Sequence, residues 1–195
     1  SRTFEGGACG VSQGLAQNGA VAHMLSIDSA DGLIREARQV ASPNFDDRPP
    51  GCEPNLIVIH GISLPPGEFG GPWIDQLFTN ALNSAAHPYF REVVGMRVSA
   101  HLLIRRDGEL VQYVPLSKRA WHSGESSYAG RDRSNDFSVG IEVEGIDNAV
   151  YTDAQYKQLA RAIIALKLAI PSLEQAPIVG HCDIANGRKL SLIHI

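Results

Sequence analysis

Two short apolar runs, far apart in the chain, each end at a histidine. The first is Asn-Leu-Ile-Val-Ile-His at residues 55–60, and the second is Ala-Pro-Ile-Val-Gly-His at residues 176–181. Both runs are rich in Ile and Val and are bounded by Pro, Gly or Asn, which is typical of buried β-strands. The pattern therefore predicts two strands that bring His60 and His181 to the rim of a sheet, where a strand end meets solvent.

Further strands are predicted between these two runs. Residues 99–104 and 109–114 flank an Asp-Gly pair at 107–108, which is a strong signal for a β-hairpin. Residues 137–143, Phe-Ser-Val-Gly-Ile-Glu-Val, predict one more strand.

Helices are predicted in three places. Thr152 forms a capping box with Gln155, and the helix that begins there is ended by Pro171. Its expected apolar stripe consists of Tyr156, Leu159, Ala160, Ile163 and Leu166. Shorter helices are expected at 29–38 and 73–78. Together with the strands, they predict an α/β fold with a central mixed β-sheet flanked by helices, in a single domain.

Composition narrows the class of protein. The 195 residues are 44% hydrophobic and 19% charged, as in a globular domain with a real core. A formal net charge of −4 gives no electrostatic basis for binding nucleic acid or an anionic membrane surface, and no apolar stretch is long enough to span a bilayer. The three cysteines are too few and too scattered for a disulfide framework, and residues 1–23 lack the pattern of a signal peptide. We therefore expect a cytoplasmic monomer.

The two histidines predict a metal site. Imidazoles delivered to one sheet rim from distant parts of the chain suit a hydrolytic zinc, which keeps a coordination position open for water. The alternative is a pair of histidines satisfied by backbone carbonyls. The sequence after His181 is Cys-Asp-Ile-Ala-Asn-Gly-Arg-Lys. It favours the metal site because a turn here would bring Lys189 back beside His181. Lys189 could stabilise charge that develops on a scissile carbonyl, unless it is simply a solvated lysine.

Two carboxylates could take part in catalysis, one near the end of the predicted strand 137–143 and one directly after it. Glu142 and Glu144 share one face of the predicted strand by its two-residue period. A carboxylate in an otherwise apolar strand is costly unless it is paired or functional, and beside a zinc site it could act as a general base. The alternative is an edge strand whose carboxylates face water. Trp121 and His122, in a loop rich in Gly and Ser, could form an aromatic platform for a sugar or peptide.

Longer stretches of the chain resemble a known family. The matching text is His-Gly-Ile-Ser-Leu-Pro-Pro-Gly-Glu-Phe-Gly-Gly-Pro-Trp-Ile-Asp at 60–75, with shorter matches at 97–101, 103–109, 118–122, 140–145 and 180–185. On this text the chain resembles the zinc-dependent N-acetylmuramoyl-L-alanine amidases, the family of phage T7 lysozyme and the peptidoglycan recognition proteins. The resemblance covers most of the chain, from about residue 33 to residue 189.

The resemblance implies roles for individual residues. It makes His60 and His181 zinc ligands, Glu142 rather than Glu144 the catalytic base, and Lys189 the group that stabilises the transition state. It adds Arg97 to Trp121 and His122 as candidates for substrate binding. The implied reaction is hydrolysis of the amide between the lactyl group of 1,6-anhydro-N-acetylmuramic acid and L-alanine in muropeptides, during cell-wall recycling. A non-catalytic muropeptide-binding module and a phage-type peptidoglycan amidase stay open as alternatives.

The chain departs from the family at one point. The family's third zinc ligand is an aspartate in Lys-Thr-Asp-Pro-Gly, but here Lys189 is followed by Leu-Ser-Leu-Ile-His-Ile. These six residues can be read back as CTG TCT CTT ATA CAC ATC, which resembles the transposon-end adapter of sequencing libraries. We therefore expect a non-native tail at 190–195, an amidase domain at 24–189 that is incomplete at its C-terminus, and a disordered or non-native extension at 1–23 before Met24.

Overall fold

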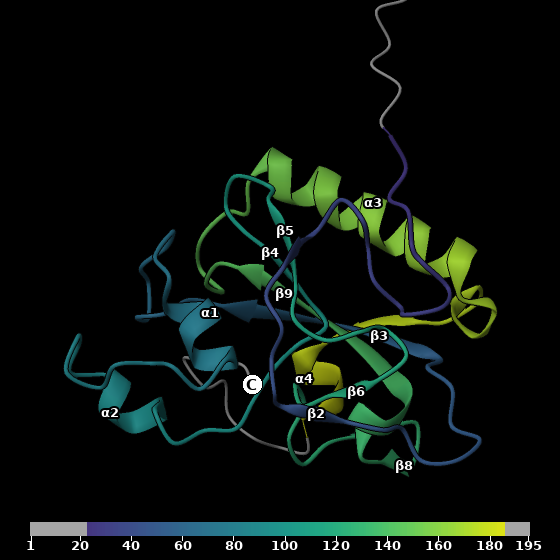
Figure 1. Cartoon of the computed structure of the whole chain (residues 1–195), viewed down its shortest axis with the longest axis horizontal. Helices are drawn as coiled ribbons and strands as arrows, with labels where there is room; N and C mark the ends of the chain where they lie inside the picture. The colour runs from purple at the N-terminus through teal and green to yellow at the C-terminus, as the bar shows by residue number, and fades with distance from the viewer. Residues whose placement is uncertain (1–22, 186–195) are drawn as a thin grey trace, which may run out of the picture.

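The computed structural model describes residues 23–185 as a six-stranded sheet with helices on both faces (Figure 1). The strands are β1 (Arg38–Gln39), β2 (Phe45–Asp46), β3 (Leu56–Ile62), β4 (Leu102–Ile104), β5 (Leu110–Gln112), β6 (Arg119–Ala120), β7 (Ser127–Tyr128), β8 (Arg131–Asp132), β9 (Ser138–Glu144) and β10 (Ile178–Gly180). The helices are α1 (Trp73–Phe78), α2 (Phe90–Val93), α3 (Asp153–Ala169) and α4 (His181–Ile184), with 3-10 turns at Ser134–Phe137 and Pro171–Leu173.

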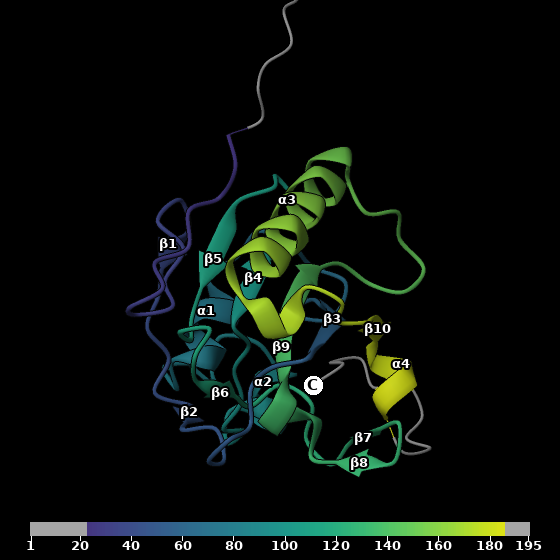
Figure 2. The ribbon, with the colours of Figure 1, turned by 90° about the vertical axis from the view of Figure 1, so that its right-hand side faces the viewer.

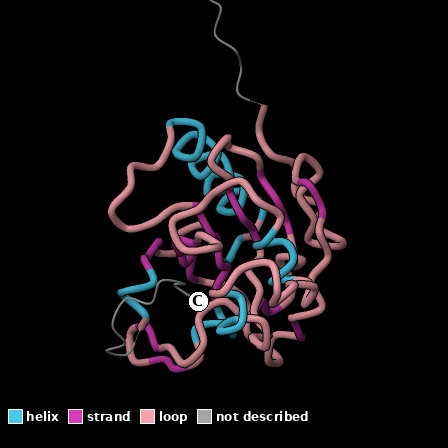
Figure 3. The backbone as a smooth tube through the Cα atoms, turned by 90° about the vertical axis from the view of Figure 1, so that its left-hand side faces the viewer, coloured by secondary structure: helices cyan, strands magenta, loops and turns pink. Residues whose placement is uncertain are grey.

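The main sheet is mixed, as the sequence predicts. Its strand order is β1-β5-β4-β9-β3-β10, in which only β4 and β5 are antiparallel neighbours. These two strands form the predicted hairpin, and its turn contains Gly108 at a φ of +88°. The pairs β2–β6 and β7–β8 form two small antiparallel sheets. Figure 3 shows how long loops connect these short elements.

The two longest strands lie in the interior of the sheet. β3 and β9 pair in parallel over seven residues, and every residue of β9 is buried. Parallel strands covered on both faces read as continuous apolar runs, which is why the sequence of β3 predicts its position well. The alternative in which the β9 carboxylates lie on an edge strand and face water is therefore wrong.

Successive residues of β4 divide the core into two layers. Leu102 and Ile104 belong to the cluster beneath α3, whereas Leu103 belongs to the cluster beneath α1 and α2. Neighbouring side chains of a strand point to opposite faces, so α3 covers one face and α1 and α2 cover the other (Figure 2).

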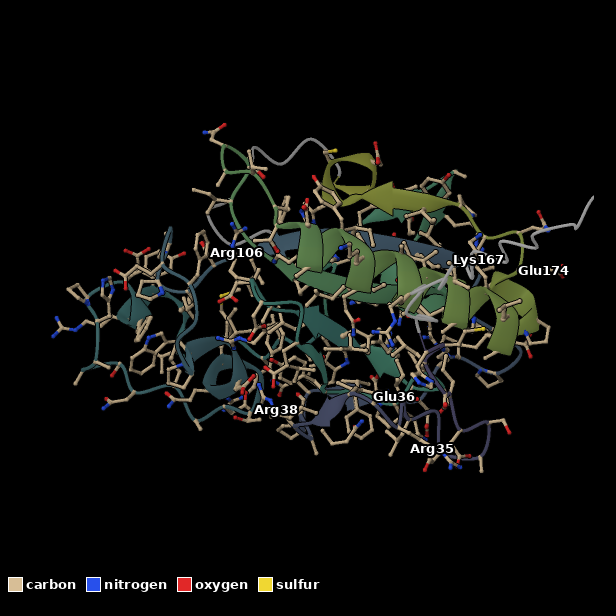
Figure 4. All side chains as sticks on the ribbon, turned by 90° about the horizontal axis from the view of Figure 1, so that it is seen from above. Arg35, Glu36, Arg38, Arg106, Lys167 and Glu174 are labelled. Carbon is tan, nitrogen blue, oxygen red and sulfur yellow. The ribbon has the colours of Figure 1, made fainter. Side chains whose placement is uncertain are left out.

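The helix α3 begins as predicted but turns a different face to the core. Thr152 and Gln155 form both hydrogen bonds of the capping box. The residues that α3 buries are Gln155, Ala162, Ala165 and Leu166, with Leu159 and Ile163 partly buried. Tyr156 and Ala160 of the predicted stripe are exposed, and Ala162 and Ala165 take their place against the sheet. Seen from above in Figure 4, Arg106 lies by the N-terminal end of α3 and Lys167 and Glu174 lie by its other end.

The helix predicted at 29–38 is wrong. Ile27 and Ile34 instead form an isolated antiparallel bridge across a turn. The carboxylates of Asp28 and Asp31 accept hydrogen bonds from backbone amides two residues further on, at 2.9 Å each. Asp side chains compete with helix formation in this way, and Gly32 supplies a φ of +73°.

Candidate metal-binding and catalytic site

His60 and His181 meet at the edge of the sheet where β10 pairs with β3. Their Nδ1 atoms lie 3.1 Å apart, and their ring centroids lie 5.1 Å apart. The predicted convergence of the two histidines is therefore confirmed, but His181 does not end a strand. It is the first residue of α4, and the carboxylate of Asp183 accepts a hydrogen bond from the Gly180 amide at the start of this turn. Cys182, next to His181, lies on α4 and is exposed.

Glu142 lies directly beside His60 on the neighbouring strand. The two residues are register partners of β9 and β3, so both side chains point to the face opposite α3. Glu142 is completely buried, and neither carboxylate oxygen has a hydrogen-bond partner among the described residues. Burial raises the pKa of this carboxyl well above its usual range. An unpartnered buried acid is costly, and this is the environment expected of a group that exchanges protons.

Glu144 is also buried but is fully engaged in hydrogen bonds. Its carboxylate accepts from the amides of Gly70 at 2.7 Å and Arg106 at 3.1 Å, and it lies 3.6 Å from the Arg105 guanidinium. Arg105 in turn donates to the carbonyl of Gly71. Glu144 therefore attaches the loop after β3 to the sheet, and this structural role separates it from Glu142.

His122 does not lie on the surface that was predicted to hold a sugar or peptide. It is completely buried, and its Nδ1 lies 2.8 Å from Nε2 of His60. Its Nε2 lies 3.0 Å from the Ser138 hydroxyl. Burial is the largest cause that lowers the pKa of His122 well below its usual range, so the ring is neutral at neutral pH. The ring packs on Gly140, where an added Cβ would come within 2.4 Å of it.

Trp121 and Arg97 have other surroundings, whereas the His101 ring lies 6.0 Å from the His122 ring, centroid to centroid. Trp121 is half-buried and donates from Nε1 to Asp46 at 3.2 Å, and Arg97 is exposed in the loop before β4. His101 is buried and accepts a hydrogen bond at Nδ1 from the Gly140 amide, which is a structural role. Lys189 and the segments 1–22 and 190–195 lie outside the described residues.

A cavity of about 370 Å³ opens beside the two histidines. His60, His181 and Cys182 line one side, and α3 contributes Tyr156 and Leu159 to the other. Sequence reasoning missed Tyr151, which also lines this cavity and whose hydroxyl packs against Gly61. Glycines within the strand sequences were the available signal, since a glycine inside a strand often marks a close approach by another group.

With this geometry, the chain belongs to the N-acetylmuramoyl-L-alanine amidase family, which it matches over residues 50–191. Curated relatives at high identity are amidases of this kind, and the sequence-based assignment to the amidases is confirmed.

Several relatives within the family are closely similar. The chain is 59% identical to 1,6-anhydro-N-acetylmuramyl-L-alanine amidase AmpD of Citrobacter freundii, over 82% of this chain and 84% of the relative. It is also 59% identical to AmpD of Escherichia coli strain K12, over 81% of this chain and 86% of the relative. A crystal structure of a selenomethionine derivative of AmpD matches the fold with a TM-score of 0.80 at 57% identity, over 85% of this chain and 90% of that chain. The predicted fold class is therefore confirmed.

Two absences concern only residues 23–185. No three His, Cys, Asp or Glu side chains in this part of the chain are grouped so that they could hold a metal ion. No helix in the same part is both long and apolar enough to cross a bilayer.

Proposed function

We propose that the chain hydrolyses the amide bond between the lactyl group of 1,6-anhydro-N-acetylmuramic acid and L-alanine in muropeptides, in cell-wall recycling and with the help of zinc. The observation that carries this proposal is the buried carboxylate of Glu142, which is in register with His60 and has no hydrogen-bond partner among residues 23–185. The high identity to AmpD relatives supports the choice of substrate.

His60 and His181 fit a zinc ion. Two nitrogens bound to a tetrahedral zinc at about 2.0–2.1 Å lie about 3.3 Å apart. The two Nδ1 atoms are 3.1 Å apart, and neutral imidazole is a preferred zinc ligand. A catalytic zinc takes three protein ligands, and the described residues supply two. We propose, from the resemblance to the family, that the third is an aspartate that the tail at 190–195 replaces.

The groups on this chain divide the proposed reaction between them. A zinc ion held by His60 and His181 would supply Lewis-acid activation of the attacking water and the scissile carbonyl. Glu142 accepts the proton of the water on its carboxylate and donates it to the nitrogen of L-alanine as the amide breaks. Its raised pKa suits this exchange, because an acid that titrates nearer neutral pH can both take and return a proton. We assign to Lys189 the stabilisation of negative charge on the carbonyl oxygen.

The cavity beside the histidines is the proposed place for part of the muropeptide. Its wall includes apolar side chains from Ile59, Val143 and Leu159, and the phenol of Tyr151 lies among them. The pKa of Tyr151 is raised by burial first, and then by the negative charges of Asp147 and Glu142. The phenol is therefore protonated and can donate a hydrogen bond to a polar group of the substrate. Arg97 and Trp121 are proposed to contact the substrate outside this cavity.

We further propose that the protein acts as a monomer in the cytoplasm, on free muropeptides and without nucleic-acid or membrane partners. The net charge of −4 supports the absence of polyanionic partners. The proposed catalytic domain spans residues 24–189.

The test compares the chain as given with a version in which Thr-Asp-Pro-Gly follows Lys189. Zinc content and hydrolysis of anhydro-muropeptides are measured for both, with Glu142→Gln in the second version as a control that should keep zinc and lose hydrolysis. Zinc affinity should rise by at least about 10- to 100-fold in the second version. Hydrolysis only in the second version would support the amidase and the replaced ligand. Equal zinc affinity would contradict the replaced ligand. No hydrolysis by either version, with muropeptide still bound, would favour a non-catalytic binding module.

A further inference from the structure

The His122 ring is held between His60 and Ser138 in a space that a glycine leaves open. The nearest atom of the ring would lie 2.4 Å from a Cβ at Gly140, which is closer than side-chain atoms approach one another. The ring nitrogens contact Nε2 of His60 on one side and the Ser138 hydroxyl on the other, at 2.8 and 3.0 Å. The three side chains therefore form one chain of hydrogen bonds that ends at a proposed zinc ligand.

The direction of the hydrogen bonds follows from the Ser138 end. The Ser138 hydroxyl lies 2.6 Å from the backbone carbonyl of Ser134, and a carbonyl oxygen can only accept. The single proton of Ser138 is therefore used in this contact. It follows that Nε2 of His122 carries a proton and donates it to the Ser138 oxygen.

The other nitrogen of His122 must then be the acceptor. A neutral imidazole that carries its proton on Nε2 has a bare Nδ1. Nε2 of His60, at 2.8 Å, therefore carries a proton and donates it to this nitrogen.

The nearby Ser123 hydroxyl does not compete for this place. It lies 3.2 Å from Nδ1 of His122 but only 2.7 Å from Oδ1 of Asn135. That Asn135 atom is an oxygen, because it also accepts from the backbone amides of His122 and Ser123. The Ser123 proton therefore belongs to Asn135.

We propose that His122 and Ser138 are positioning residues that hold His60 with its proton on Nε2, and so direct the bare Nδ1 of His60 toward Nδ1 of His181. A histidine can bind a metal only through a bare nitrogen, and the partner of its other nitrogen selects which one this is. The consequence for zinc rests on the proposed function, whereas the proton positions do not.

The first measurement is made on the full chain without metal. In ¹H–¹⁵N correlation spectra of the histidine rings, the ¹⁵N shift separates a protonated nitrogen from a bare one. We expect His60 and His122 each to carry the proton on Nε2 and to have a bare Nδ1. A proton on Nδ1 of either ring would overturn the proposal.

The second measurement compares two serine variants. Ser138→Ala removes the acceptor for His122, and the His60 signals should move toward a mixture of the two tautomers. Ser134→Ala is the matched control, because it deletes a buried hydroxyl that has no partner in the described part of the chain but keeps the carbonyl that accepts from Ser138. Unchanged His60 signals in a folded Ser138→Ala variant would contradict the proposal.

Zinc titration of the same serine variants, made in the version that carries Thr-Asp-Pro-Gly after Lys189, separates this inference from the proposed function. Zinc affinity should fall about 10- to 100-fold in Ser138→Ala and stay at the wild-type value in Ser134→Ala. Equal losses in both variants would contradict a positioning role. If the unsubstituted version with Thr-Asp-Pro-Gly after Lys189 shows the expected tautomers but binds no zinc, the positioning role of His122 and Ser138 stands and the zinc assignment is wrong.

Discussion

Glu142 and Glu144 lie two residues apart on β9, and both are buried, but only Glu144 has hydrogen-bond partners among the described residues. The sequence period places them on one face without telling them apart. The difference comes from the elements that approach each residue, since the loop after β3 and the β4–β5 hairpin reach Glu144. One carboxylate thus stabilises the fold, and the other is left chemically available beside His60.

We expect Glu142→Gln to stabilise the protein at pH 8. The folded-state pKa of Glu142 is raised, so its protonated form stabilises the fold below about pH 4.5, and this contribution is lost as pH rises. Removing the acid should raise the free energy of unfolding at pH 8 by about 1 kcal/mol or more. Urea denaturation at pH 5 and pH 8 measures this. The exposed Glu53→Gln control should change it by less than about 0.5 kcal/mol, and a loss of stability in Glu142→Gln would contradict the prediction.

Glu144→Gln should release the loop that follows β3. The substitution removes the charge that faces Arg105 and weakens the hydrogen bond to the Gly70 amide. Hydrogen exchange of the amides at 67–71 should become at least about tenfold faster, because a charged hydrogen bond of this kind is worth about 1.5–3 kcal/mol. Glu109→Gln is a suitable control, since the Glu109 side chain is 38% exposed. Its ion pair with Arg38 therefore contributes little to stability. Equal exchange in both variants would show that Glu144 does not hold the loop.

The elements that the sequence predicts well are those with strong local signals. The run at 55–60 and the capping box at Thr152 each carry their own pattern, and β3 and α3 form there. His60 and His181 could be paired as candidates because each follows such a run. The resemblance to the family then separated Glu142 from Glu144, which the strand period alone could not do.

What the sequence could not supply depends on contacts between distant segments. His122 lies in a loop with little local pattern, and only its packing between Gly140 and His60 shows that it is buried.

The helix expected at 29–38 fails for a local reason instead, because the side chains of Asp28 and Asp31 accept hydrogen bonds from the backbone. That signal was present in the sequence as an Asp-Gly pair at 31–32.

His101 should make the protein sensitive to acid. Burial first, and the nearby charge of Arg48 second, lower the pKa of His101 to about 3. The folded state therefore keeps this ring neutral while the unfolded chain takes up a proton below about pH 6.5. Stability from this group is complete above pH 6.5 and is lost as pH falls toward 3, at up to about 1.4 kcal/mol per pH unit.

The measurement is the free energy of unfolding at pH 8 and pH 5. His101 should account for about 2 kcal/mol of the loss between them. His101→Gln keeps a donor for the Lys118 carbonyl and does not titrate. The free energy of unfolding of this variant should therefore fall less between pH 8 and pH 5, by that amount. Identical pH slopes for the two proteins would show that His101 is not a source of acid sensitivity.

Gly140→Ala should disturb the buried histidine cluster more than its size suggests. An added methyl at this position would lie 2.4 Å from the His122 ring, and β9 has interior neighbours on both sides that prevent its backbone from moving away. Overpacking of this kind costs about 1–3 kcal/mol of folding stability.

Gly95→Ala is the matched control, because a Cβ there meets nothing within 4 Å. Its effect on the free energy of unfolding should lie within about 0.5 kcal/mol of zero or be stabilising. Because the displaced ring would also lose its contact with His60, Gly140→Ala should reduce zinc affinity, and Gly95→Ala should not. Thermal unfolding and zinc titration of both variants test this, and equal stability of the two would mean that His122 has more room than its packing indicates.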